Sequence, residues 1–261
     1  MRLPKAGIEV HIGIWVDTAD LAEMVDRCQS LAGEFGGVAA EIIRCDPESP
    51  RRGFIATLYC AAPWAAGETA AQAMRSAVKP VAVKHRLNDE YLDFFGDPEN
   101  GGYASLWFNE EEFSGYVLYL VHAAHGGLQL EEWDPGVRED FTLGDDSDLI
   151  AKVSHRFPGA DLAAALGQAL PIAESIGASG LQFLATDGSC EVVMFAVRPV
   201  VDGESLETSL RRVGATLAAQ LGVDPSAFVL GGTGEDLVGA LESVGDSQPV
   251  ATLHRRTAEE D

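Results

Sequence analysis

The sequence predicts an α+β protein in which one unit of mainly antiparallel sheet, with helices on one face, occurs twice in tandem. Three observations support this fold class. Strand periodicity and helical periodicity alternate along the chain. Several stretches of sequence recur with an offset of about 140 residues. Hydrophobic residues make up 46% of the 261 residues, which is enough apolar material for a folded core.

The first unit is expected to begin with a strand and a helix. Residues 8–16 alternate apolar with other side chains, which is the period of a strand, and residues 150–157 are their counterpart. Residues 20–36 place apolar side chains at helical spacing. Residues 161–177 repeat that apolar face 141 positions later, so the same strand and helix are predicted twice.

The elements that follow also match between the copies. Two successive strands are predicted, the first at 41–46 and 182–187 and the second at 54–60 and 190–196. The most specific match is Pro-x-x-x-Gly-Glu-Thr/Ser, at 63–69 and again at 199–205. Thr69 and Ser205 are candidate N-caps of the next helices, because a hydroxyl oxygen there can accept a hydrogen bond from an unpaired helix N–H.

The remainder of each copy is interpreted as strand, helix and strand. The predicted strands are 103–108 and 227–230, the helices 111–126 and 235–244, and the closing strands 128–133 and 250–254. Each copy then reads β-α-β-β-α-β-α-β. Its β-α-β-β-α-β core is similar to a ferredoxin-like arrangement. Two such units in one chain predict a fused dimer with a pseudo-twofold axis.

The boundary between the copies is expected in an acidic stretch. Residues 131–148 hold eight acidic side chains and one arginine, and they lack the spacing of a calcium-binding loop. The predicted organisation is a first repeat with an aromatic and acidic insertion, an acidic linker, and a second repeat with a short disordered acidic tail. The corresponding ranges are 1–140, about 85–102, 141–148 and 149–261.

Charge limits the classes of partner. The chain has 41 acidic and 18 basic residues and a formal net charge of −23. This disfavours nucleic acid and anionic membranes, which require a basic surface. It favours a basic protein partner, while a high-salt habitat or base composition remain alternative explanations. No membrane span or secretory signal is evident, so the expected compartment is the cytoplasm, and the four cysteines are expected to be free thiols.

Aromatic residues are unevenly distributed. All four tryptophans and all five tyrosines lie before residue 134. Tryptophan and tyrosine are enriched at interaction hot spots, and acidic neighbours favour a basic partner. The predicted partner contacts are Tyr91, Asp93, Phe94, Phe95, Asp97, Trp107, Glu111 and Trp133.

No motif predicts a catalytic, cofactor or metal site. His122 and His125, close to Glu132, are three residues apart on a predicted helix and would share one face, which is a weak signal for a metal or catalytic site. His11 shares a strand face with Glu9, and such a polar sheet face could bind a ligand or the sheet of the other copy. These two are not expected to act as a base and its orienting group, because they lie two residues apart on one strand.

The sequence is consistent with three classes of function. The first is a non-catalytic neutraliser or chaperone of a basic protein, such as a toxin or a secreted effector. In general character, acidic and without a catalytic motif, the chain is similar to immunity proteins of bacterial toxin systems. The second is a regulatory module that binds a small ligand at the seam between the repeats, and the third is an enzyme with a site near His122 and His125. A monomer is expected, because the two copies are already fused.

Overall fold

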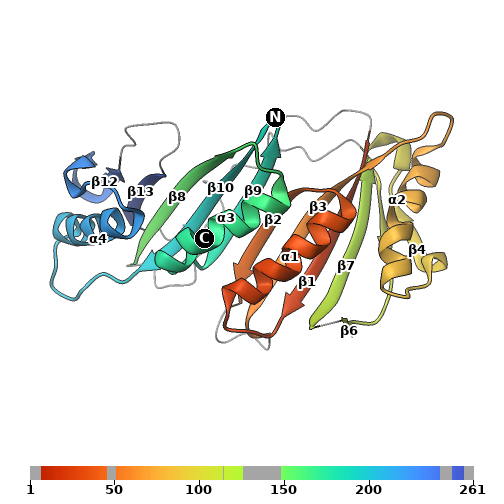
Figure 1. The fold of residues 1–261 in the computed structure, drawn as a ribbon, viewed down its shortest axis with the longest axis horizontal. Coiled ribbons are helices and arrows are strands. Elements are labelled where there is room, and N and C mark those ends of the chain that lie inside the picture. The colour runs from red at the N-terminus through yellow and green to blue at the C-terminus, as the bar shows by residue number, and fades with distance from the viewer. Residues whose placement is uncertain (1–6, 46–50, 114, 126–147, 242–248, 256–261) are drawn as a thin grey trace.

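In the part of the chain that the structure describes, thirteen strands form one continuous sheet, and four α-helices cover one of its faces (Figure 1). The structure is a computed structural model, and it describes residues 7–45, 51–113, 115–125, 148–241 and 249–255. Every strand pair within these residues is antiparallel. The protein is therefore a mixed α+β fold, and none of the helices described is long and apolar enough to cross a membrane.

The first half of the chain contributes seven strands and two helices. Helix α1 begins after Asp20, whose carboxylate accepts a hydrogen bond from the Ala22 N–H at 2.9 Å, and it ends at Gly36 in the left-handed conformation. Two short 3-10 turns, Asp89–Tyr91 and Pro98–Asn100, flank β4. The elements are β1 (Gly7–Val16), α1 (Leu21–Phe35), β2 (Gly37–Arg44), β3 (Phe54–Pro63), α2 (Ala70–Lys84), β4 (Leu92–Phe95), β5 (Tyr103–Leu106), β6 (Glu111–Phe113) and β7 (Tyr116–His125).

The second half contributes six strands and two helices. Two 3-10 turns, Pro225–Ala227 and Gly234–Asp236, flank β11. The segment 85–102, expected as an insertion, shares this succession of a 3-10 turn, a strand and a second 3-10 turn. The elements are β8 (Leu149–Pro158), α3 (Leu162–Ser175), β9 (Gly180–Thr186), β10 (Ser189–Arg198), α4 (Leu206–Leu221), β11 (Phe228–Gly231), β12 (Val238–Leu241) and β13 (Val250–Arg255).

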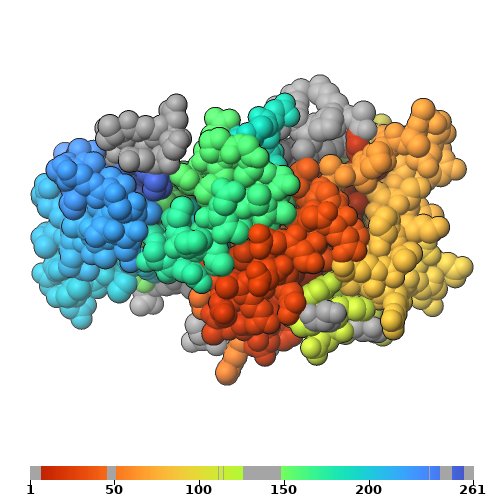
Figure 2. Space-filling model, in the orientation of Figure 1, coloured from red at the N-terminus to blue at the C-terminus, as the bar shows by residue number. Residues whose placement is uncertain are grey.

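The two halves meet at the β2–β9 pair in the middle of the sheet. From there β3, β1, β7, β5 and β4 follow on one side, β10, β8, β13, β12 and β11 on the other, and β6 pairs with β7. Helices α1 and α3 lie side by side over this junction (Figures 1 and 2). The Gln29 side-chain amide of α1 donates to the Ala163 carbonyl of α3 at 2.8 Å. One buried apolar core extends across the junction, so the halves share a single interior.

The expected helix at 111–126 is wrong, because these residues form β6 and β7. A β-bulge explains the error. Ile14 of β1 faces Leu118 of β7 and Gly13 faces Leu120, so Tyr119 is an extra residue on β7. The buried side chains of β7 therefore include Leu118 and Val121, three residues apart, which imitates helical spacing.

The expected helix at 235–244 is also wrong over the residues that the structure describes. Gly234–Asp236 is a 3-10 turn and β12 follows it. The predicted strands at 103–108, 227–230 and 250–254 are confirmed as β5, β11 and β13. The predicted strand at 128–133, residues 141–147 of the linker and the tail at 256–261 lie outside the described residues.

Candidate functional site

Four aromatic side chains lie exposed together at the β4–β5 end of the sheet. They are Tyr91, Phe95, Tyr103 and Trp107, each between 37% and 63% exposed. The Phe95 ring stacks on Tyr103 with centroids 5.0 Å apart, and it lies 6.4 Å from the Trp107 ring. We name these four residues the aromatic cluster. A contiguous exposed apolar surface of this kind marks an interaction site more often than an isolated exposed ring does.

Local structure holds the cluster in place. Phe95 and Tyr103 are direct cross-strand partners in the β4–β5 pair, which sets one ring beside the other. The Trp107 N–H donates to the Tyr91 carbonyl at 3.1 Å, so the ends of the two strands are tied together. Tyr91 and Trp107 also line an open groove of about 560 Å³ together with Arg86.

The predicted partner contacts fall into two groups, because alternation along β4 points Phe95 and Phe94 to opposite faces of the strand. Tyr91, Phe95 and Trp107 belong to the cluster, and Asp93 is exposed on the same strand. Phe94 instead packs against the core, with the Arg75 guanidinium 5.7 Å from its ring centroid. Sequence reasoning missed Tyr103, although its place in the 103–108 strand was a usable signal.

The remaining predicted contacts have other roles or are not described. The Asp97 carboxylate accepts hydrogen bonds from the Glu99 N–H at 3.0 Å and the Asn100 amide at 2.6 Å, so it caps a 3-10 turn. The side chain of Glu111 and the whole of Trp133 lie outside the described residues.

A row of polar side chains continues from the cluster across the face of the sheet opposite the four described helices. The Tyr103 ring lies 5.5 Å from that of His122, which is the cross-strand partner of His11. Further along, the Tyr59 hydroxyl donates to Glu41 Oε2 at 3.2 Å, and Glu41 faces Gln182 across the β2–β9 pair. We name this set, completed by Glu9, the polar row: His122, His11, Glu9, Tyr59, Glu41 and Gln182.

Three members of the polar row are almost fully buried. Glu9, Glu41 and Gln182 are each at most 5% exposed. Among the described residues, Glu9 Oε2 and both polar atoms of the Gln182 side chain have no hydrogen-bond partner. An unpaired buried polar group costs about 1–3 kcal/mol, so this row is a candidate for binding a polar group.

The histidines do not form the arrangement that a helix would have given. His122 and His125 lie on opposite faces of β7, because they are three residues apart on a strand. The His125 ring packs edge-on against Trp64 at 4.5 Å, under the helices, whereas burial and the nearby His11 lower the pKa of His122. The expectation that His122 and His125 share one face is therefore wrong.

The side chains of His11 and Glu9 are also arranged differently from the expectation that they do not act together. His11 Nε2 contacts Glu9 Oε1, so the side chains converge although they lie on one strand. Within the described residues, no group of three or more His, Cys, Asp or Glu side chains is placed to hold a metal ion. Burial raises the pKa of the Cys60 and Cys190 thiols to about 12, which makes them poor nucleophiles.

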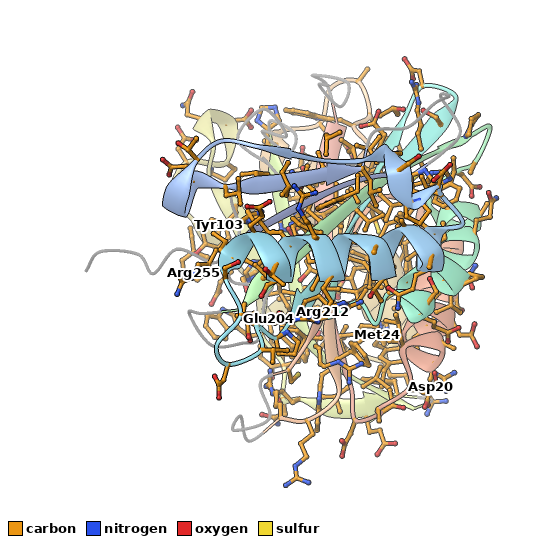
Figure 3. The ribbon with its side chains drawn as sticks, turned by 90° about the vertical axis from the view of Figure 1, so that its left-hand side faces the viewer. Asp20, Met24, Tyr103, Glu204, Arg212 and Arg255 are labelled. Atoms are coloured by element: carbon orange, nitrogen blue, oxygen red, sulfur yellow. The ribbon has the colours of Figure 1, made fainter. Side chains whose placement is uncertain are left out.

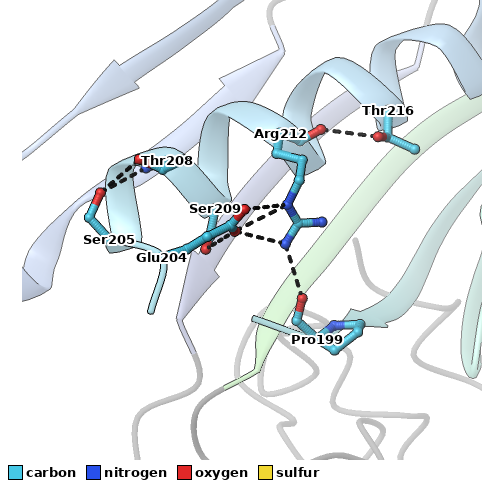
Figure 4. A network of polar contacts seen from close by, with 7 residues as sticks. All are labelled: Pro199, Glu204, Ser205, Thr208, Ser209, Arg212 and Thr216. Carbon is cyan, nitrogen blue, oxygen red and sulfur yellow. Dashed lines mark hydrogen bonds and ion pairs between the residues drawn. The ribbon is translucent and has the colours of Figure 1, made fainter. Parts of the chain in front are cut away.

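The repeated Pro-x-x-x-Gly-Glu-Thr/Ser motif serves the helix starts. Just before α4, Glu204 accepts hydrogen bonds from the Ser209 hydroxyl at 2.8 Å and from the Arg212 guanidinium at 3.1 Å (Figure 4). Figure 3 labels Glu204 and Arg212 beside this helix. The Ser205 hydroxyl caps α4 by accepting from the Thr208 N–H at 3.2 Å. Thr69 caps α2 in the same way, so both predicted N-caps are confirmed.

No protein-family model and no curated protein sequence matches this chain.

Proposed function

We propose that this chain is a non-catalytic binding protein that captures a basic protein, as a neutraliser of the immunity or chaperone type. The observation that carries the proposal is the aromatic cluster at the end of the sheet. Large rigid rings with a polar atom supply most of the binding free energy at many protein interfaces. The cluster has four exposed rings, three of which carry a polar atom, and its Phe95 ring lies beside both Tyr103 and Trp107, so it forms an anchor for a partner.

Charge supports a basic partner. The net charge of −23 speeds the approach of a cation over long distances. Asp93 and Glu90 are exposed beside the cluster and would pair with lysine or arginine at its rim. Arginine also binds the faces of tryptophan and tyrosine rings. We therefore expect the association rate to fall as salt concentration rises.

We also propose that the two halves are copies of one ferredoxin-like unit, related by a pseudo-twofold axis at the β2–β9 pair. The sheet order on either side of this pair and the shared element succession support this. The second half has no equivalent cluster, since Gly231 pairs with Val238 where Phe95 pairs with Tyr103. In this proposal the first half binds the partner and the second half supports it structurally.

The test begins with purification of the chain from its native cell at low and at moderate salt. A stoichiometric basic partner should be recovered and identified by mass spectrometry. Combined Tyr91→Ala, Phe95→Ala and Trp107→Ala substitution should then weaken its binding at least about thirtyfold, as expected for loss of hot-spot rings. The melting temperature should stay nearly unchanged, because these rings are exposed.

Two controls separate binding from folding. Combined Val229→Ala and Val238→Ala substitution removes exposed apolar side chains from the second half and should leave binding intact. Phe94→Ala removes a ring that packs against the core and should lower the melting temperature. Full binding by the triple aromatic variant, or the absence of any basic partner, would overturn the proposal.

A second candidate function is small-ligand binding at the junction of the halves, and one observation favours it. Gln182 is 1% exposed and both its polar side-chain atoms lack a described partner. A ligand with both donor and acceptor groups would satisfy them. Addition of a small-molecule extract of the native cell should then raise the melting temperature of the wild type and not that of Gln182→Leu. The same response in both proteins would exclude Gln182 from ligand binding.

A further inference from the structure

A cavity of about 330 Å³ lies between α1 and α2 above strands β1 and β3, on the face of the sheet that carries the helices. Its volume falls within the range of small-molecule sites, and its lining is mostly apolar. The walls include Val10, Phe35, Cys60, Ala77 and Val81. Neither the aromatic cluster nor the polar row contributes to it.

The polar groups around this cavity are hydrogen-bond acceptors. Pro80 lies inside α2 and has no N–H, so the carbonyl of Ser76 loses its donor within the helix. Ser76 and Pro80 both line the cavity, which places this carbonyl on the cavity side of α2. The Ser76 hydroxyl lies 3.4 Å from Glu68 Oε1 as a donor, so it is not free to donate to a ligand.

Charge at the cavity favours a cation. Glu34 is the one charged residue that lines it within the described part of the chain. Lys84 forms an ion pair with Glu34, but Glu68 adds a second carboxylate through its contact with Ser76. Glu34 thus supplies the charge on the cavity wall, and the Glu68 carboxylate lies next to the lining residue Ser76.

The second half lacks these features at the same places in its helices. Arg212 and Thr216 lie as far after the N-cap of α4 as Ser76 and Pro80 lie after that of α2. The Thr216 hydroxyl donates to the Arg212 carbonyl at 3.0 Å (Figure 4), so the carbonyl that matches that of Ser76 has a donor. Ser175 occupies the place in α3 that Glu34 has in α1. Within the described residues, the second half therefore lacks the two acceptor groups, at the Ser76 and Glu34 positions, that characterise this cavity.

We propose that this cavity binds a small apolar amine. The apolar body lies against Val10, Phe35 and Val81. The protonated amino group donates to the Ser76 carbonyl and the Glu34 carboxylate. This site is independent of partner capture, and its test requires no partner.

The test uses 2-phenylethylamine as the probe, with 2-phenylethanol and phenylacetate as matched neutral and anionic compounds. Isothermal titration of the full chain should show saturable binding of the amine. The affinity for phenylacetate should be at least about tenfold weaker, because the Glu34 carboxylate repels its carboxylate and the Ser76 carbonyl cannot donate to it. No saturable binding of the amine, or equal binding of the amine and the carboxylate, overturns the proposal.

Variants locate the site. Glu34→Gln should weaken amine binding about tenfold and leave the binding of the alcohol unchanged, since a charge-assisted hydrogen bond is lost. Ala77→Leu should fill the cavity and remove binding of both compounds, with the melting temperature as the check on folding. Glu23→Gln, an exposed carboxylate of the same helix paired with Arg27, is the matched control and should bind as the wild type does. Amine binding that survives both Glu34→Gln and Ala77→Leu would overturn this location.

Discussion

At the scale of single residues, His85 shows how burial fixes a protonation state. Its Nδ1 lies 2.8 Å from the Val81 carbonyl oxygen, and because that oxygen can only accept, Nδ1 carries the hydrogen. Its Nε2 lies 2.8 Å from the Tyr116 hydroxyl and accepts from it. Burial lowers the pKa of His85 in the folded protein. The neutral ring thus links the end of α2 to β7.

This state has a consequence for stability against pH. The unfolded chain takes up a proton on His85 below about pH 6.5, and the folded chain resists it, so stability falls as the pH drops below that value. One such group contributes a slope of at most about 1.4 kcal/mol per pH unit. His122 and His155, whose pKa values are also lowered by burial, act in the same direction. His85→Gln should therefore reduce this slope without removing it.

Urea unfolding between pH 7.5 and pH 5 measures the effect. Tyr116→Phe is the control, because it removes the hydrogen bond to Nε2 and keeps the titrating ring. It should lower stability across the range and retain a positive slope with pH. An unchanged slope in His85→Gln would show that the native state admits the proton at this ring.

At the scale of elements, the sequence was most informative where a period was long and its ends were capped. The helix expected at 20–36 is α1, and Thr69 and Ser205 are N-caps. The prediction failed at β7, where the bulge opposite Gly13 and Ile14 shifts the buried positions by one residue. A bulge is a property of a strand pair, so the sequence of one strand does not reveal it.

The candidate site, too, could be predicted from the sequence only in part. Composition pointed to Tyr91, Phe95 and Trp107, because aromatic residues are concentrated in the first half. It did not separate Phe95 from Phe94, since that requires the register of β4 against β5. Of the polar row, the sequence analysis singled out Glu9, His11 and His122, and it did not predict Tyr59, Glu41 or Gln182. Its members come together only through pairing across strands far apart in sequence, such as Glu41 with Gln182.

At the scale of the whole molecule, the junction of the halves is part of the core and is not a linker. Five residue pairs, from Ala39 with Leu184 to Ile43 with Gly180, join β2 to β9. Helices α1 and α3 pack over this pair, and the buried cluster continues from Ile42 to Leu181 beneath them. Neither half would keep its apolar surface covered without the other.

We therefore expect the chain to unfold in a single cooperative transition, with equal calorimetric and van't Hoff enthalpies in scanning calorimetry. Leu181→Asp would place a charge without a partner at a fully buried position of the junction, which should destabilise the protein by more than about 3 kcal/mol. The single transition should move as a whole, because the damage lies in the interior that both halves share. Val229→Asp, at an exposed position of β11 far from the junction, should cost little. Two resolved transitions in the wild type, or a loss confined to one of two transitions in Leu181→Asp, would show instead that the halves fold separately and that the first could work without its scaffold.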